Sequence, residues 1–100
     1  MSDPVRVLAI LQADPGKGPD QLAAFERLAP LVRAEDGCLQ YDLHAVLDAP
    51  DQFVVVEQWA SREALDAHLA SDHLAAYAAG VPAFRAQPAD VLILGHDRIA

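Results

Sequence analysis

Four histidines are the side chains of this sequence that can titrate near neutral pH without help from their surroundings. They are His44, His68, His73 and His96. An imidazole within hydrogen-bonding reach of a phenolic hydroxyl can remove its proton and act as a general base. His68 is the first candidate, because it lies in phase with Leu65 and Leu69 on the apolar face of a predicted helix. The same position also suits a buried histidine that is hydrogen-bonded to Glu57 or to a backbone carbonyl.

A carboxylate interrupts the apolar alternation of a predicted strand. Phe53, Val55, Glu57 and Trp59 fall on one side of residues 53–59, so Glu57 points the same way as its apolar neighbours. An inward carboxylate requires a donor or a cation as partner. If that partner is His68, it fixes the tautomer of the imidazole and raises its basicity. Glu57 and His68 are therefore the predicted catalytic residues.

Aromatic residues near this pair are candidates for substrate binding. Trp59 and Phe53 either pack in the core or form a wall for a flat aromatic ligand, with the indole N–H orienting a ligand oxygen. Tyr41 and His44 have opposite parity in the second predicted strand, so only one of them points into a given cavity. The predicted substrate-binding residues are Trp59, Phe53, Tyr41, His44, His73 and Tyr77.

Two of these residues have equally simple structural roles. Tyr77, with Leu74 and Val81, either closes the mouth of a pocket or packs on its helix. His73 follows a helix cap, where side chains commonly serve the cap itself.

The sequence predicts no metal site. Chelation from one helix needs a spacing of three or four residues, whereas His68 and His73 are five apart, about 140° around a helix. Neither H-E-x-x-H nor C-x-x-C occurs. Cys38 is the single cysteine and has no adjacent basic residue to lower its pKa, so we interpret it as a small structural side chain.

Hydrophobic periodicity and turn residues place these side chains on six elements. Strands are predicted over 5–12, 38–47, 53–59 and 89–94, because β-branched and apolar runs there are bounded by turn-forming residues. A helix is predicted to begin at Asp20 or in the turn before it, with a kink or an early end near Ala29 because of Pro30, and to resume to Arg33. Its expected buried stripe is Leu22, Phe25, Leu28, Ala29 and Val32.

The second helical region follows the third strand and contains two caps. Ser61 precedes a helix with Ala64, Leu65, His68 and Leu69 on one face, and Ser71 precedes a short helix that ends at Gly80. The order β-α-β-β-α-β predicts a ferredoxin-like α+β fold, with a four-stranded antiparallel sheet and helices on one face.

Both faces of the predicted sheet are apolar, although helices can cover only one. Val5, Val7, Ala9 and Leu11 point one way from the first strand, while Leu8 and Ile10 point the other way. Exposed apolar area costs about 25 cal/mol per Å². We therefore expect the uncovered face to pack against a second copy of the chain, which makes a homodimer.

Composition narrows the possible partners and compartment. The formal net charge is −8, and the seven basic residues are scattered, so neither nucleic acid nor a membrane surface is an expected partner. No run of 18 apolar residues and no secretory leader pattern occurs. The expectation is one cytoplasmic domain over residues 1–100.

Three segments together resemble the antibiotic biosynthesis monooxygenase family. They are Gly37-Cys38-Leu39-Gln40-Tyr41, the strand Phe53 to Trp59 with its E-x-W pattern, and Ala64 to Leu69 followed by Ser71-Asp72-His73-Leu74. With the Pro15-Gly16-Lys17 turn, the likeness extends over nearly the whole chain. The resemblance implies a dimeric α/β barrel. It also implies oxidation of a quinol or polyphenol by O₂ without a cofactor.

Other branches of the same fold give the alternatives. Heme-degrading relatives carry an Asn in the first strand, a Trp at the position of His68 and a proximal His near Ala78, so this chain departs from all three. A lactone isomerase-like enzyme and a non-catalytic, ligand-binding or stress-related dimer remain as alternatives.

Overall fold

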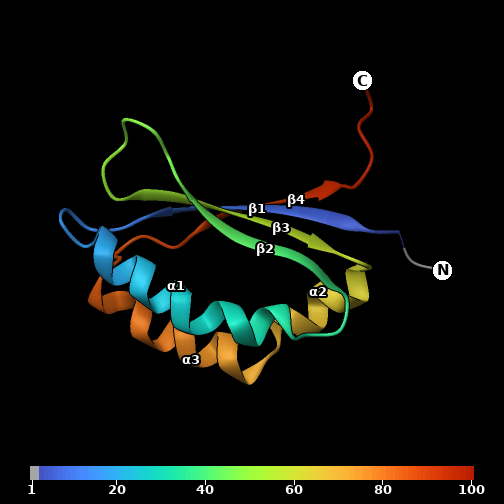
Figure 1. The fold of residues 1–100 in the computed structure, drawn as a ribbon, viewed down its shortest axis with the longest axis horizontal. Helices are drawn as coiled ribbons and strands as arrows, with labels where there is room; N and C mark the ends of the chain where they lie inside the picture. Colours follow the sequence, from blue (N-terminus) through green and yellow to red (C-terminus); the bar gives the residue numbers. More distant parts are fainter. Residues whose placement is uncertain (1–2) are drawn as a thin grey trace.

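The computed structural model describes residues 3–100. Its elements are β1 (Val5–Gln12), α1 (Gly18–Arg33), β2 (Cys38–Ala45), β3 (Gln52–Trp59), α2 (Arg62–Leu69), α3 (Asp72–Gly80), the 3₁₀ turn η1 (Val81–Ala83) and β4 (Asp90–Gly95). The strands form one antiparallel sheet in the order β2-β3-β1-β4. All three α-helices lie on the same side of this sheet (Figure 1). The predicted ferredoxin-like α+β fold is confirmed.

The sheet register fixes which side chains share the helix-covered face. Val7 is opposite Glu57, and Ala9 is opposite Val55. In β2, Tyr41 is also opposite Glu57. Since opposed residues of an antiparallel pair point to the same side, Tyr41 and Glu57 both point toward the helices.

The turn between β2 and β3 is anchored to the start of α1 by one aspartate. Asp48 and Asp51 both have a φ of 61°, a conformation that Asp tolerates better than most residues. The carboxylate of Asp51 accepts hydrogen bonds from the backbone N–H of Gly16 and of Gly18, at 2.9 and 2.8 Å. These bonds satisfy backbone donors at the beginning of the helix and hold the two loops together.

Helix α1 differs from its prediction in its buried stripe and in the effect of Pro30. Leu22 is 42% exposed, and the buried residue in its place is Gln21. The helix also continues past Pro30 to Arg33, its predicted end, without the early end near Ala29 that was the alternative to a kink. Pro30 lies in the last turn, and the carbonyl that loses its donor belongs to Glu26 on the exposed side, where water can replace the bond.

The second helical region is two helices, each with a serine cap as predicted. The hydroxyl of Ser61 accepts from the Ala64 N–H, and that of Ser71 accepts from the Leu74 N–H. The break near residue 70 changes the direction of the chain between α2 and α3. Leu69 was expected on the buried face but is exposed; it is the last residue of α2 and lies at the pocket.

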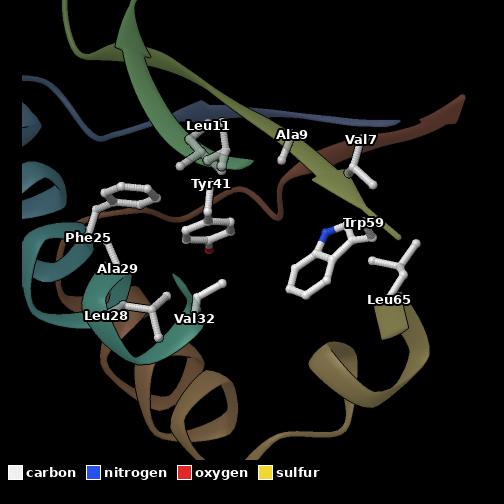
Figure 2. Packing of buried hydrophobic residues seen from close by; sticks show 11 residues of the cluster. Val7, Ala9, Leu11, Phe25, Leu28, Ala29, Val32, Tyr41, Trp59 and Leu65 are labelled. Carbon is white, nitrogen blue, oxygen red and sulfur yellow. The ribbon is translucent and has the colours of Figure 1, made fainter. Parts of the chain in front are cut away.

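The core lies between the helices and the inner face of the sheet. Figure 2 shows Tyr41 and Trp59 reaching from the sheet toward the helices, among aliphatic side chains of β1, α1 and α2. Trp59 and Val32 are completely buried. The apolar residues that form this cluster are Val7, Ala9, Leu11, Phe25, Leu28, Ala29, Val32, Tyr41, Val55, Trp59 and Leu65.

The outer face of the sheet is apolar along its centre and carries no helix (Figure 1). Leu8 lies between Val56 of β3 and Leu92 of β4 in the register, and Ile10 is opposite Val54. Leu92 is 52% exposed. Within residues 3–100, no helix has the length and apolar character that crossing a membrane requires.

Candidate functional site

A pocket of about 310 Å³ lies between the inner face of the sheet and the helices. This volume is at the small end of the range for sites that bind small molecules. Most of its wall is aliphatic or aromatic, and its polar side chains are Tyr41, Glu57, His68, Tyr77 and Arg85. Val91 and Ile93 of the edge strand β4 also line it and are partly exposed, so the pocket reaches the surface along β4.

A second hollow, of about 480 Å³, lies between α1 and α3. It is larger, and it includes His73 and Tyr77, but it lacks Tyr41, Glu57 and His68. Buried groups that can transfer protons therefore gather in the smaller pocket, which we take as the candidate site.

Glu57 is a buried carboxyl group with a single hydrogen-bond donor from a neighbouring side chain. It is 6% exposed, and Nε1 of Trp59 donates to its Oε1 at 2.9 Å. Burial raises the pKa of Glu57, although the Trp59 hydrogen bond and the nearby His68 act in the opposite direction. Glu57, one of the two partners considered for His68, is not hydrogen-bonded to it among the described residues.

His68 is hydrogen-bonded to Glu35, which lies in the turn between α1 and β2. The distance from His68 Nδ1 to Glu35 Oε2 is 2.8 Å, and His68 is 3% exposed. Its ring stacks on Trp59, with centroids 4.6 Å apart, and meets Tyr41 edge-on at 5.7 Å. A carboxylate and two aromatic rings thus hold the imidazole in one orientation.

His73 joins the same carboxylate from another helix. Its Nε2 lies 2.7 Å from Glu35 Oε2, so one oxygen serves both imidazoles. The helical spacing that argued against a metal site does not apply here, because His68 is on α2 and His73 on α3. The three side chains place a ligand atom each within 4.8 Å of one another, which is a set that could hold a metal ion. In the structure they form a hydrogen-bonded cluster.

Of the two residues with opposite parity in β2, Tyr41 is the one that points into the pocket. It is buried and stacks on Phe25, with ring centroids 5.1 Å apart. Burial, followed by the charge of Glu57, raises the pKa of Tyr41 far above that of an ordinary tyrosine, so its hydroxyl stays protonated. His44 is opposite Val54, on the outer face, and is exposed.

The other predicted residues lie around the pocket rather than within one cluster. Tyr77 lines the pocket, and its hydroxyl accepts from Nε2 of Gln21 at 2.7 Å. Trp59 and Phe53 pack in or against the core on the pocket side of β3. Trp59 nevertheless contacts both predicted catalytic residues.

Sequence reasoning missed two charged residues, Glu35 and Arg85. Glu35 lies in a turn between acidic and small residues, where a carboxylate is ordinarily solvated, and nothing in the local pattern distinguishes it. Arg85 follows η1 and belongs to no predicted strand or helix. Only the tertiary structure brings Glu35 to His68 and Arg85 to the pocket.

Comparison with known proteins agrees with this architecture. The antibiotic biosynthesis monooxygenase family matches residues 4–80. The chain belongs to this family. A relative from Mycobacterium tuberculosis named "Putative monooxygenase Rv0793" is 35% identical over 94% of this chain and 92% of its own. Its solved structure has a TM-score of 0.86 with 33% identity, and the likeness covers 98% of this chain and 100% of that one.

Two further relatives extend the likeness. The Escherichia coli protein named "Probable quinol monooxygenase YgiN" is 36% identical, and the match covers 75% of this chain and 82% of YgiN. The crystal structure of PA3566 from Pseudomonas aeruginosa has a TM-score of 0.87 at 32% identity and covers 98% of both chains. This chain is therefore a homologue of proteins named as monooxygenases, in both sequence and fold.

Proposed function

We propose that this protein oxidises a small hydroxylated aromatic, such as a quinol, with O₂ and without a cofactor. The relative named as a quinol monooxygenase supports the substrate class. A naphthohydroquinone and O₂ would give a hydroxynaphthoquinone and water, so the substrate itself supplies all the electrons. The contribution of the protein is to bind the quinol, exclude water and remove a proton.

The hydrogen bond between buried His68 and partly buried Glu35 is the observation that carries this proposal. When Nδ1–H of His68 donates to the Glu35 carboxylate, the lone pair of the imidazole is on Nε2. His68 lines the pocket, so this nitrogen is available to a bound phenolic hydroxyl. Removing that proton gives a phenolate, which donates an electron to O₂ far more readily than the neutral phenol does.

Tyr41 and Glu57 complete the proposed site. Tyr41 keeps its hydroxyl proton and can donate it to a quinol oxygen. Glu57 takes up a proton more readily than an ordinary glutamate, because burial disfavours its charge. The apolar remainder of the wall favours a flat, largely apolar ring system over a hydrophilic ligand.

The uncovered sheet face supports a homodimer as part of the same proposal. Leu8, Val56 and Leu92 form the centre of that face, and no helix of residues 3–100 lies over it (Figure 1). A second copy with the same face would bury these side chains.

Oxygen consumption tests the proposed activity. Metal-stripped protein should consume O₂ with naphthohydroquinones faster than buffer does. His68→Ala should lose that excess by about 100-fold or more, the usual contribution of a general base. His96→Ala is the matched control, because His96 lies in the C-terminal tail and contacts Asp97 rather than the pocket. Rates equal to buffer across a varied quinol panel would reject the proposal.

A second candidate function follows from the same two groups. A base at His68 and a carboxyl with a raised pKa at Glu57 also suit proton transfer within a lactone or a related carbonyl compound, as in an isomerase. Such a reaction needs no O₂. Turnover of a substrate under strictly anaerobic conditions would favour it, whereas a retained ligand with no turnover would favour a binding protein.

A further inference from the structure

Arg85 is a buried cation whose side chain has no complete set of partners. It follows η1, and its backbone N–H is fixed by the carbonyl of Val81 at 2.9 Å. The residue is 7% exposed and lines the pocket. Within the described chain, Nε and Nη1 of its guanidinium are buried and have no hydrogen-bond partner.

An unpaired guanidinium in such a place is energetically unfavourable. Arginine stays charged in proteins, and a charge buried without a partner destabilises the folded state. A guanidinium has two edges that can bind a carboxylate with parallel hydrogen bonds, and each edge includes either Nε or Nη1. Neither edge is therefore fully used by the described residues.

The carboxylates near the pocket are occupied elsewhere. Glu57 accepts from Trp59, and Glu35 accepts from His68 and His73. Asp14 is adjacent to the Arg85 segment, but its carboxylate accepts from the backbone N–H of Ala86. Over residues 3–100, no ion pair with Arg85 is formed.

The net charge of the rest of the molecule is opposite in sign to that of Arg85. The chain has a net charge of −8, with only seven basic residues, so its overall field repels anions. A buried arginine in an apolar pocket does not serve solubility. It gives the pocket one point at which an anionic group can replace lost water with charge-assisted hydrogen bonds.

We infer that the ligand of this pocket is an aromatic compound that carries a carboxylate, and that Arg85 binds that carboxylate. The inference rests on the proposed function only in taking this pocket as the ligand site. It narrows the substrate class to acidic aromatics, because neutral quinols leave the guanidinium unpaired. Arg85 is then a residue that determines specificity, separate from the proton transfer at His68.

A binding experiment without turnover tests the inference. Calorimetry would compare 2-naphthoate with 2-naphthamide, which has nearly the same shape but no charge. The wild-type protein should bind the acid at least about 10-fold more tightly, since charged bidentate pairs are strong. Arg85→Met should bind both probes with similar affinity, and Arg85→Lys should keep part of the preference because it retains the charge but not the planar fork.

Arg62→Met is the matched control. Arg62 is exposed and paired with Asp66 on the helix surface. Its replacement therefore removes the same charge as Arg85→Met, but far from the pocket. It should keep the wild-type preference. Thermal unfolding of Arg85→Met checks that the variant is folded, and its melting temperature should not fall, because the substitution removes an unpaired buried charge.

Several results would overturn the inference. These are equal binding of the acid and the amide by the wild-type protein, binding of neither probe, or a preference that persists in Arg85→Met. Dissociation of a wild-type dimer on this substitution, with no acid preference, would show that a partner copy supplies the anion. Because O₂ plays no part in the measurement, an acid preference that depends on Arg85 stands even if the proposed oxidation fails.

Discussion

The two faces of the sheet are built from the same strands but differ in one respect. Val55 and Val56 are neighbours in β3, and each lies among apolar side chains. The inner face, however, includes Glu57 and the hydroxyl of Tyr41, both buried beneath helices. The centre of the outer face, formed by Leu8, Val56 and Leu92, contains no such group.

This difference shows how two apolar surfaces can serve different purposes. Burying Glu57 costs free energy and raises its pKa, so its presence on the inner face needs an explanation beyond stability. The centre of the outer face buries no ionisable group. Its composition suits a surface that is covered by another apolar surface, whereas the inner face combines a core with a site.

Among truncations to alanine, the largest expected effect is on the inner face, at Trp59. Trp59→Ala should lower the free energy of unfolding by about 3–5 kcal/mol, because Trp59 is completely buried and the substitution leaves a cavity. Urea unfolding measures this change. Leu47→Ala is the control, since Leu47 is 89% exposed and should change stability by less than about 0.5 kcal/mol.

A tolerated Trp59→Ala would contradict the assignment of this residue to the core. It would also mean that Glu57 does not depend on its indole donor.

A substitution on the outer face should change self-association rather than the stability of the fold. Val56→Lys places a charge at its centre and should weaken the proposed dimer by about 100-fold or more, since an unpaired ammonium is costly to bury. Sedimentation velocity over a concentration series measures the shift from dimer to monomer. In contrast, Val55→Lys directs the charge into the core and should prevent folding.

A wild-type chain that sediments as a monomer at micromolar concentration would refute the proposed use of the outer face.

The sequence predicts the sheet better than it predicts the site, for a physical reason. Strand limits and the shared face of Val55, Glu57 and Trp59 depend on alternation within one element, which is a local property. The Ser61 and Ser71 caps are local too. The caps and the shared face are confirmed, and the strand limits agree to within two residues; β2 ends at Ala45, not at residue 47.

The partners of His68 depend instead on how elements meet. Glu35 comes from a turn, and His73 from a helix whose direction changes after residue 70. Neither position shows a periodic signal. Likewise, burial of Gln21 instead of Leu22 depends on the hydroxyl of Tyr77, which lies 2.7 Å from Nε2 of Gln21. Contacts between distant segments of this kind cannot be read from the spacing of residue types.

A smaller effect is expected at Glu57, and it depends on pH. Burial raises the pKa of Glu57 in the folded protein above its ordinary value of 4.5. The folded state therefore holds a proton that the unfolded chain has already lost, and this contribution to stability falls as the pH rises from 4.5 through the raised pKa. Glu57→Gln cannot ionise, so its stability relative to the wild type should increase over that interval.

Urea unfolding of both proteins at about pH 4 and about pH 8 checks this sign. The difference between variant and wild type should be more favourable to the variant at the higher pH. A difference that is the same at both pH values would show that Glu57 ionises in the folded protein as readily as in the unfolded chain.

The smallest effect is expected for His44→Ala, and it makes the contrast between the faces sharpest. His44 and His68 are the same residue type, but His44 is exposed on the outer side of the edge strand β2, while His68 is buried beside Trp59 and Tyr41. Its replacement should change the free energy of unfolding by less than about 0.5 kcal/mol and leave O₂ consumption unchanged. Both quantities can be measured on the same preparation as the wild type. A large loss of turnover with intact folding would place chemistry on the outer face, since the orientation of β2 prevents His44 from reaching the pocket of its own chain.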